Sequence, residues 1–157
     1  MEWLYLARWL HVIGATVLLG TGSGIAFFML IGHRTRDPRL IAHVASTVVL
    51  ADFVFTASAV ILQPLTGWWL ASLAGWPLAT PWILLSIGLY FLTGAFWLPV
   101  VWMQVKMRDL ARAAEIDGEP LPPLYFSLFR AWFLCGIPAF AAVLTIIWLM
   151  IARPALW

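Results

Sequence analysis

The sequence predicts an all-α integral membrane protein, a bundle of four transmembrane helices with both termini outside the cytoplasm. Hydrophobic residues make up 64% of the 157 residues, charged residues make up only 10%, and the apolar residues gather in four long runs. Soluble domains are typically about half apolar and about a quarter charged. A water-soluble fold would therefore expose too much apolar surface, and a single membrane domain over residues 1–157 is the simplest organisation.

Each apolar run is long enough to cross a bilayer, which needs about 20 residues at about 1.5 Å of rise per residue. The expected spans are residues 9–31, 40–62, 82–105 and 131–152. Asp37-Pro38 and Thr80-Pro81 mark two helix starts, because an N-cap side chain followed by proline is typical of a helix N-terminus. The first run follows Glu2 rather than a basic segment and is too long for a signal peptide, so we expect it to be a helix.

Two connections differ in composition. Residues 63–81 contain no charge and several tryptophans, so we expect this segment to lie along the outer membrane surface. The third span should continue past the membrane as a charged, solvated helix through Met107 to Ala114. Gly118 and the prolines that follow it should then break the helix.

The distribution of lysine and arginine predicts the orientation, because cytoplasmic loops are enriched in both. Only Arg8 and Arg153 of the nine basic residues fall on one side of the membrane. The seven on the other side are Arg34, Arg36, Arg39, Lys106, Arg108, Arg112 and Arg130. Indole rings prefer the interface, and the tryptophans expected near the outer side are Trp3, Trp9, Trp68, Trp69, Trp76, Trp82, Trp148 and Trp157. The N-terminus and the C-terminus of the chain should thus lie outside and the charged loops inside.

Other classes are not indicated. The net charge of +2 is too small to favour a nucleic-acid partner. Cys135 is the single cysteine, so the chain has no intramolecular disulfide and no CxxC motif. No HExxH, P-loop or GxSxG motif supports hydrolase or nucleotide chemistry.

Polar residues within the spans are informative, because a polar group facing lipid is costly and usually turns inward. At about 100° per residue, Asp52, Thr56 and Gln63 share one face of the second span, and Thr66 joins them if the helix continues. The third span has a similar stripe of Ser86, Tyr90, Thr93, Trp97 and Gln104. Together the two stripes predict a polar bundle interior.

Asp52 lies near the middle of its span, where an ionised carboxylate costs roughly 2.5 kcal/mol or more. No lysine or arginine lies at a comparable depth, so we expect the carboxyl to be protonated. Two interpretations stay open. Asp52 is either a proton-relay or substrate-binding acid, or a neutral structural acid that hydrogen-bonds to Thr93 or Tyr90.

The first span carries small residues at a spacing of four. Thr16, Gly20 and Gly24 form a seam that permits close helix contact. We expect this seam to pack against a neighbouring helix.

His11 lies about one turn inside the outer end of the first span, and Gly14 and Gly22 share its face. Small residues beside a histidine leave room for a flat macrocycle, so His11 is a candidate metal ligand, to the iron of haem b. The alternative is a hydrogen-bonded packing histidine. The polar candidates for a second axial ligand are Gln63, Tyr90 and Thr66, none of which binds iron strongly, so the iron would be five-coordinate or weakly six-coordinate.

His33 is roughly 33 Å from His11 by the helical rise, so the two cannot share one haem. His33 and His43 flank the short inner loop. They would either form a second haem or metal pair there or stay as solvated loop residues.

Several segments together resemble the bacterial membrane family called domain of unknown function 2269. They are residues 10–14 (LHVIG), 20–24 (GTGSG), Asp52, 63–67 (QPLTG) and 128–130 (LFR). The resemblance covers nearly the full length and implies a multi-pass protein of the bacterial inner membrane.

More distantly, the chain is similar to a superfamily that includes copper resistance protein D and a haem-containing membrane protoporphyrinogen oxidase. In that oxidase a first-helix histidine is implicated in haem binding, and His11 is the matching position. The oxidase's fourth-helix lysine has no lysine counterpart here, where Arg130 is the basic residue near the inner end. Protoporphyrinogen oxidation is therefore not implied.

Three hypotheses follow. The first is a b-type haem protein of membrane redox chemistry or electron transfer, acting with a membrane redox partner. The second is a carrier for a small solute, metal ion or proton through the polar interior. The third is an accessory or assembly subunit without catalysis of its own. A homo-oligomer is a separate expectation for the partners of the chain.

Overall fold

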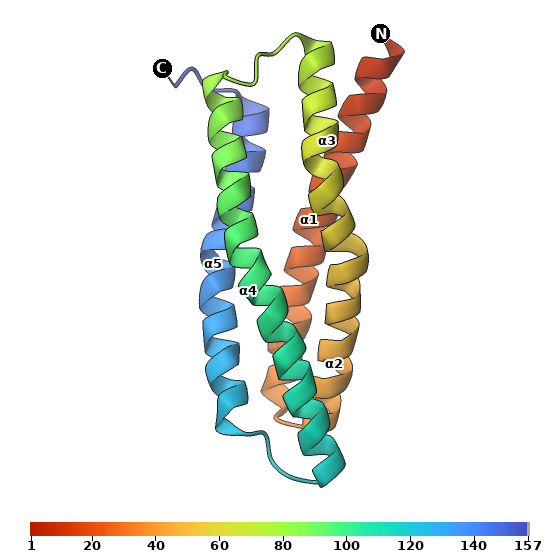
Figure 1. The fold of residues 1–157 in the computed structure, drawn as a ribbon, viewed down its shortest axis with the longest axis vertical. Helices are drawn as coiled ribbons and strands as arrows, with labels where there is room; N and C mark the ends of the chain where they lie inside the picture. The colour runs from red at the N-terminus through yellow and green to blue at the C-terminus, as the bar shows by residue number, and fades with distance from the viewer. Residues whose placement is uncertain (157) are drawn as a thin grey trace.

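The computed structural model describes residues 1–156, which form helices joined by short loops and contain no strand. The elements are α1 (Glu2–Thr35), α2 (Pro38–Ala51), η1 (Asp52–Thr56), α3 (Ala57–Ala74), α4 (Pro81–Asp117) and α5 (Pro123–Ala152). Because α2, η1 and α3 form one continuous helix, the described chain has four helices long and apolar enough to span a membrane (Figure 1). The predicted four-helix membrane bundle is confirmed.

The helices are longer than the sequence predicted. The segment 63–81 was expected to lie along the membrane surface, but the second helix continues through Pro64 to Ala74, and Gly75 ends it in the left-handed conformation with φ 71°. The start expected at residue 131 is also wrong, because α5 begins at Pro123. Buried Tyr125 and Phe129 anchor its first two turns. Arg130 therefore lies on a helix rather than in a loop.

Helix termini follow local capping chemistry. The Asp37 carboxylate accepts a hydrogen bond from the Arg39 backbone N–H at 2.9 Å, as its N-cap position predicts. Thr80 instead donates its hydroxyl to the Pro77 carbonyl at 2.6 Å and gives α4 no side-chain cap.

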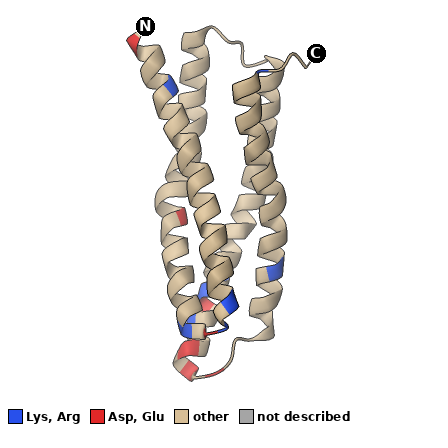
Figure 2. Ribbon diagram, turned by 180° about the vertical axis from the view of Figure 1, so that it is seen from behind, with Lys and Arg blue, Asp and Glu red and all other residues tan. Residues whose placement is uncertain are grey.

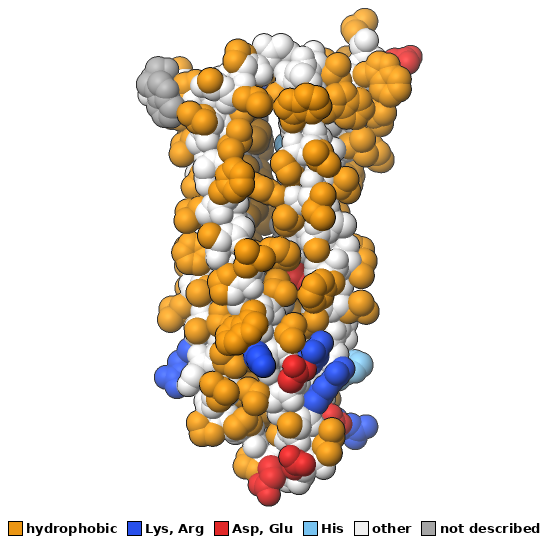
Figure 3. Space-filling view, in the orientation of Figure 1, with side chains coloured by type: hydrophobic (Ala, Val, Ile, Leu, Met, Phe, Trp, Pro, Cys, Tyr) orange, Lys and Arg blue, Asp and Glu red, His pale blue; other side chains and the backbone are white. Residues whose placement is uncertain are grey.

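The bundle is closed in one half and divided in the other. In the half that holds the termini, α1 packs on α3 and α4 packs on α5, and the space-filling surface is hollowed between the pairs (Figure 3). Toward the opposite end α2 packs on both α1 and α4. The main apolar core lies in this closed half and is built from Ile25, Met29, Ile41, Ala42, Ala45, Val48, Met103, Met107, Ala111, Ala114, Leu121, Tyr125, Phe129 and Trp132.

Charged residues gather at the end opposite the termini (Figure 2). Between the two ends the surface is largely apolar (Figure 3). Both termini thus lie at one end and the basic loops at the other, which agrees with a cytoplasmic location for the basic end.

Tryptophan rings and the Arg153 guanidinium pack together at the end that holds the termini. Trp3 and Trp69 lie 6.3 Å apart between ring centroids, and Trp76 and Trp82 lie 5.7 Å apart. The Arg153 guanidinium lies 5.8 Å from each of the latter two rings, within the range of a cation–π contact. Trp157, also expected at this interface, lies outside the described residues.

The small-residue seam of the first helix does not pack as predicted. Cβ atoms added at Gly20 and Gly24 would meet no neighbour within 4 Å, and Thr16 is exposed. Close helix approach occurs instead at Gly32, where an added Cβ would lie 3.3 Å from Val44. The reason is that α1 meets α3 through a different face in this half, at His11 and Gly14, so the seam has no neighbour.

Reporter fusions test the orientation. Fusions after Asp37 and Gly118 should report a cytoplasmic location, and a fusion after Gly75 an external one, because the basic loops are retained inside. Paired alkaline phosphatase and green fluorescent protein reporters would measure this. An external signal at Asp37 would overturn the orientation.

Candidate functional site

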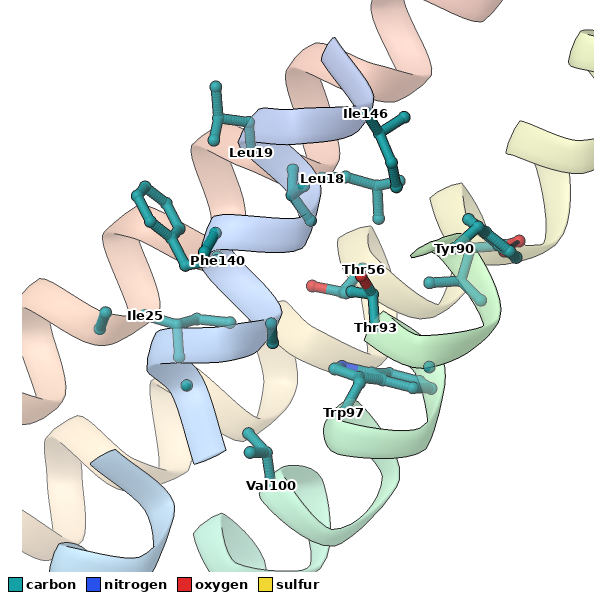
Figure 4. Close-up of a pocket in the computed structure, with 18 of the residues that line it drawn as sticks. Leu18, Leu19, Ile25, Thr56, Tyr90, Thr93, Trp97, Val100, Phe140 and Ile146 are labelled. Atoms are coloured by element: carbon teal, nitrogen blue, oxygen red, sulfur yellow. Dashed lines mark hydrogen bonds between the residues drawn. The ribbon is translucent and has the colours of Figure 1, made fainter. Parts of the chain in front are cut away.

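A cavity of about 880 Å³ lies between the α1/α3 pair and the α4/α5 pair. Its walls are mostly apolar and include the small residues Gly22, Gly94 and Gly136. The six residues expected in a polar interior all line it: Asp52, Thr56, Gln63, Tyr90, Thr93 and Gln104. Figure 4 shows Thr56, Thr93 and Trp97 on one side of the cavity and Leu19, Ile25 and Phe140 on the other.

Asp52 is the central polar group, with only 3% of its surface exposed. The Trp97 indole N–H donates to Asp52 Oδ1 at 3.2 Å. The sequence pointed to Thr93 or Tyr90 as partner, and this is wrong, because the Thr93 hydroxyl donates to Leu89 of its own helix and Tyr90 bonds elsewhere. Trp97 is one turn further along α4, level with the carboxyl.

A second tryptophan fixes the other side of the carboxyl. The Trp132 indole can only donate, so the Gln104 amide oxygen accepts its N–H at 3.1 Å. That orientation turns the Gln104 amide nitrogen toward Asp52, where it donates to Oδ2 at 3.0 Å. Both oxygens of the carboxyl thus receive an N–H donor. No sequence pattern singles out Trp132, since one tryptophan among eleven carries no specific signal.

The backbone at Asp52 is itself unusual. Residues 52–56 form a π-helical turn, in which the Asp52 carbonyl accepts the Ala57 N–H. Such turns occur frequently at functional sites. Asp52 and Thr56 are both buried at the cavity, where the Thr56 hydroxyl has no hydrogen-bond partner among residues 1–156.

Tyr90 supplies a hydrogen-bond donor that Pro64 removes from the second spanning helix. Pro64 has no N–H, so the Val60 carbonyl, four residues earlier, loses its usual helical donor. The Tyr90 hydroxyl donates to this carbonyl from α4. This bond links α3 to α4 across the cavity and helps to explain why the helix continues past the proline.

His11 lies in the contact between α1 and α3. The Thr66 hydroxyl already donates to the Leu62 carbonyl at 2.9 Å, so it accepts from His11 Nδ1 at 3.1 Å. The Gln63 amide nitrogen donates to the His11 carbonyl at 3.2 Å and lies 3.5 Å from Nε2. The ring packs so closely on Gly67 that an added Cβ there would lie 3.0 Å from Cε1.

These contacts do not fit haem ligation. Iron would need the lone pair of Nε2, since Nδ1 is the donor to Thr66, but Nε2 faces the Gln63 amide nitrogen at 3.5 Å. The clearance predicted at Gly14 is filled, because the Gln63 side-chain oxygen would overlap a Cβ there. Gly22 lines the cavity, but His11 and Gly14 are not among its lining residues.

Residues 5–154 match the family described as predicted integral membrane protein, DUF2269. The chain belongs to this family. No curated protein matches the chain, and no solved structure matches it. The relation to copper resistance protein D and to the haem-containing oxidase therefore stays an expectation from the sequence.

His33 and His43 lie in separate environments. His33 stacks on Phe129 with ring centroids 3.7 Å apart, and its Nδ1 lies 3.4 Å from the Tyr125 hydroxyl. His43 is exposed in a surface groove beside Ser46, whose hydroxyl accepts from Arg112 at 2.9 Å. Among residues 1–156 no hydrogen bond joins the two histidines, and no group of three or more potential ligands is suited to a metal ion.

The bond between Tyr90 and Val60 can be tested by a double-mutant cycle. Tyr90→Phe should lower the free energy of unfolding by about 1 kcal/mol, because the Val60 carbonyl loses its donor. In a Pro64→Ala background the destabilisation caused by Tyr90→Phe should fall towards zero, since the backbone N–H of residue 64 can again donate to the Val60 carbonyl. Unfolding in mixed detergent micelles would measure both values. Tyr5→Phe, at an exposed site, is the control, and equal costs of Tyr90→Phe in the two backgrounds would contradict the assignment.

Proposed function

We propose that this protein binds a small lipophilic molecule inside the membrane, in the cavity between its two helix pairs. The observation that carries the proposal is an 880 Å³ cavity with apolar walls and one hydrogen-bonded acid, Asp52, on its lining. Small-molecule pockets have about this size and composition, with a few placed polar groups among apolar ones.

The walls favour a lipophilic ligand over a hydrated ion. Leucine, isoleucine, phenylalanine and small residues dominate the lining. A hydrated solute would lose its water shell against these walls without enough polar groups to replace it. The Thr56 hydroxyl, which is on the cavity lining and has no partner among residues 1–156, supplies an additional hydrogen-bonding position.

The closed half of the bundle supports binding rather than free passage. Beyond Asp52 and Gln104 the interior is filled by the main apolar core, including Met103, Met107 and Phe129. A ligand can therefore enter from the half that holds the termini, and transport to the other side would need that core to open. The carrier hypothesis is consistent with the cavity only if such an opening occurs.

Haem b is the second ligand to be tested, since the distant resemblance implies it and Gly22 lines the cavity. It would require His11 to leave Thr66 and Gln63. A bacterial inner-membrane location, a membrane redox partner and a homo-oligomer likewise stay predictions from the sequence.

Filling the cavity tests the proposed function. Gly22 faces open space and lines the cavity, whereas Gly20 faces open space and does not line it. Gly22→Phe should weaken binding of the neutral dye Nile red by about tenfold, which is about 1.4 kcal/mol. Gly20→Phe, with the same change of size on the same helix, should bind as the unmodified protein does.

Fluorescence titration in nanodiscs would measure these affinities. A second pair, Gly136→Phe at the cavity and Gly88→Phe away from it, repeats the comparison on other helices. Absence of saturable dye binding, or equal loss in both members of each pair, would show that lipid acyl chains alone occupy the space.

The role of His11 has a separate test. His11→Ala should lower the free energy of unfolding by about 1–2 kcal/mol, because its bond to Thr66 and its packing on Gly67 are lost. Unfolding in mixed micelles measures this loss, and His43→Ala, at an exposed site, is the control. The pyridine haemochrome assay on protein from haem-replete cells should give no stoichiometric haem. Haem that is present and disappears only in His11→Ala would support the haem hypothesis instead.

A further inference from the structure

We propose that the ligand of the cavity is a lipophilic organic cation, and that Asp52 releases a proton to the solvent when the cation binds. This inference rests on the proposed function and names the chemical class of the ligand. No covalent bond to carbon changes. The carboxyl loses its proton to water, and the resulting carboxylate forms an ion pair with the cation.

The first observation concerns the titratable residues that line the cavity. Asp52 and Tyr90 are the titratable residues of its lining: none of the lining residues of α1, α3 or α5 is titratable, and Tyr90 is the single one from α4. The α3 sequence contains no charged residue at all. An isolated carboxylate at this depth is costly, so Asp52 must hold either a proton or a positively charged partner.

The partner has to come from outside the bundle. The basic residues of the chain lie near its two ends (Figure 2), and the one ion pair among residues 1–156 joins Arg108 to Asp109. A cation that enters the cavity can therefore satisfy Asp52 where the protein itself offers none.

The hydrogen bonds around Asp52 suit an anion. Trp97 and Gln104 each donate an N–H to a different carboxyl oxygen, and N–H donors aimed at both oxygens stabilise the ionised form. Trp132 holds the Gln104 amide in the donating orientation. The surroundings of Asp52 thus stabilise a carboxylate, and a bound cation would supply its opposite charge.

The aromatic side chains of the cavity walls suit the apolar groups of an organic cation. Aromatic side chains from α4 and α5 line the cavity, including Tyr90, Trp97, Trp132 and Phe140. The faces of aromatic rings attract cations, more strongly where water is excluded. A delocalised or alkylated cation also loses little hydration on entering an apolar space. A neutral ligand would need no acid, since the Thr56 hydroxyl already offers a hydrogen bond.

The experiment compares two probes of the same shape and opposite charge. Binding of tetraphenylphosphonium and of tetraphenylborate to the purified full-length protein in nanodiscs is measured by calorimetry between pH 5 and pH 8.5. We expect the cation to bind, with an affinity that rises about tenfold per pH unit while Asp52 still holds its proton, since one proton leaves per cation bound. Calorimetry in buffers of different ionisation enthalpy counts that proton directly. The anion should bind at least about tenfold more weakly.

Asp52→Asn supplies the matched variant. It should lose cation binding by at least about tenfold, together with its pH dependence, and a single gel-filtration peak with unchanged helical circular dichroism shows that the variant is folded. Infrared spectra should contain a protonated carboxyl band that disappears in Asp52→Asn and, in the unmodified protein, on addition of tetraphenylphosphonium.

The outcomes separate the two proposals. If Nile red binds and is blocked by Gly22→Phe, but the two probes bind equally or no proton is released, the cation inference is wrong and the cavity function stands. If neither Nile red nor the probes bind, the proposed function fails. The proton count comes from the unmodified protein, so it decides the question even if Asp52→Asn does not fold.

Discussion

The structure depends on how it satisfies one carboxyl group inside an apolar bundle. Asp52 has almost no exposed surface, and a polar group in that position is tolerated only with partners supplied by neighbouring helices. Trp97 and Gln104 provide them from α4, and Trp132 of α5 orients the amide. This chain of donors ties the second, third and fourth spanning helices together at the level where the bundle changes from closed to divided.

The division of the bundle follows from which side chains fill it. In the closed half, methionines and large aromatic residues of α4 and α5 occupy the interior against α1 and α2. In the other half, glycine and alanine are frequent on the facing surfaces. These small side chains leave space between helices that the larger side chains of the closed half hold apart. Tyr90 is the residue that still bridges this half, because its hydroxyl supplies the donor that Pro64 removes.

The small residues beside His11 have two possible uses, a ligand site or a close contact between helices. A histidine with small residues on its face is compatible with a haem site. In this structure Gly14 is used for close contact between helices, because Gln63 fills the space beside it, and Gly67 of α3 receives the imidazole. Which of the two uses applies depends on the position of α3, and the sequence of α1 contains no information about that position.

Composition and helical period predict the class of protein, the four crossings, the shared end of the termini and the inward face of the polar residues. Each follows from local composition or helical period, which do not depend on the neighbours of a residue. Helix ends at residues 63 and 131 were misplaced, because the Tyr90 bond and the buried Tyr125 and Phe129 are tertiary contacts. The π turn at Asp52, the roles of Trp97 and Trp132, and the cavity were decided only by the tertiary structure, since they depend on the distances between helices and on which side chains meet across them.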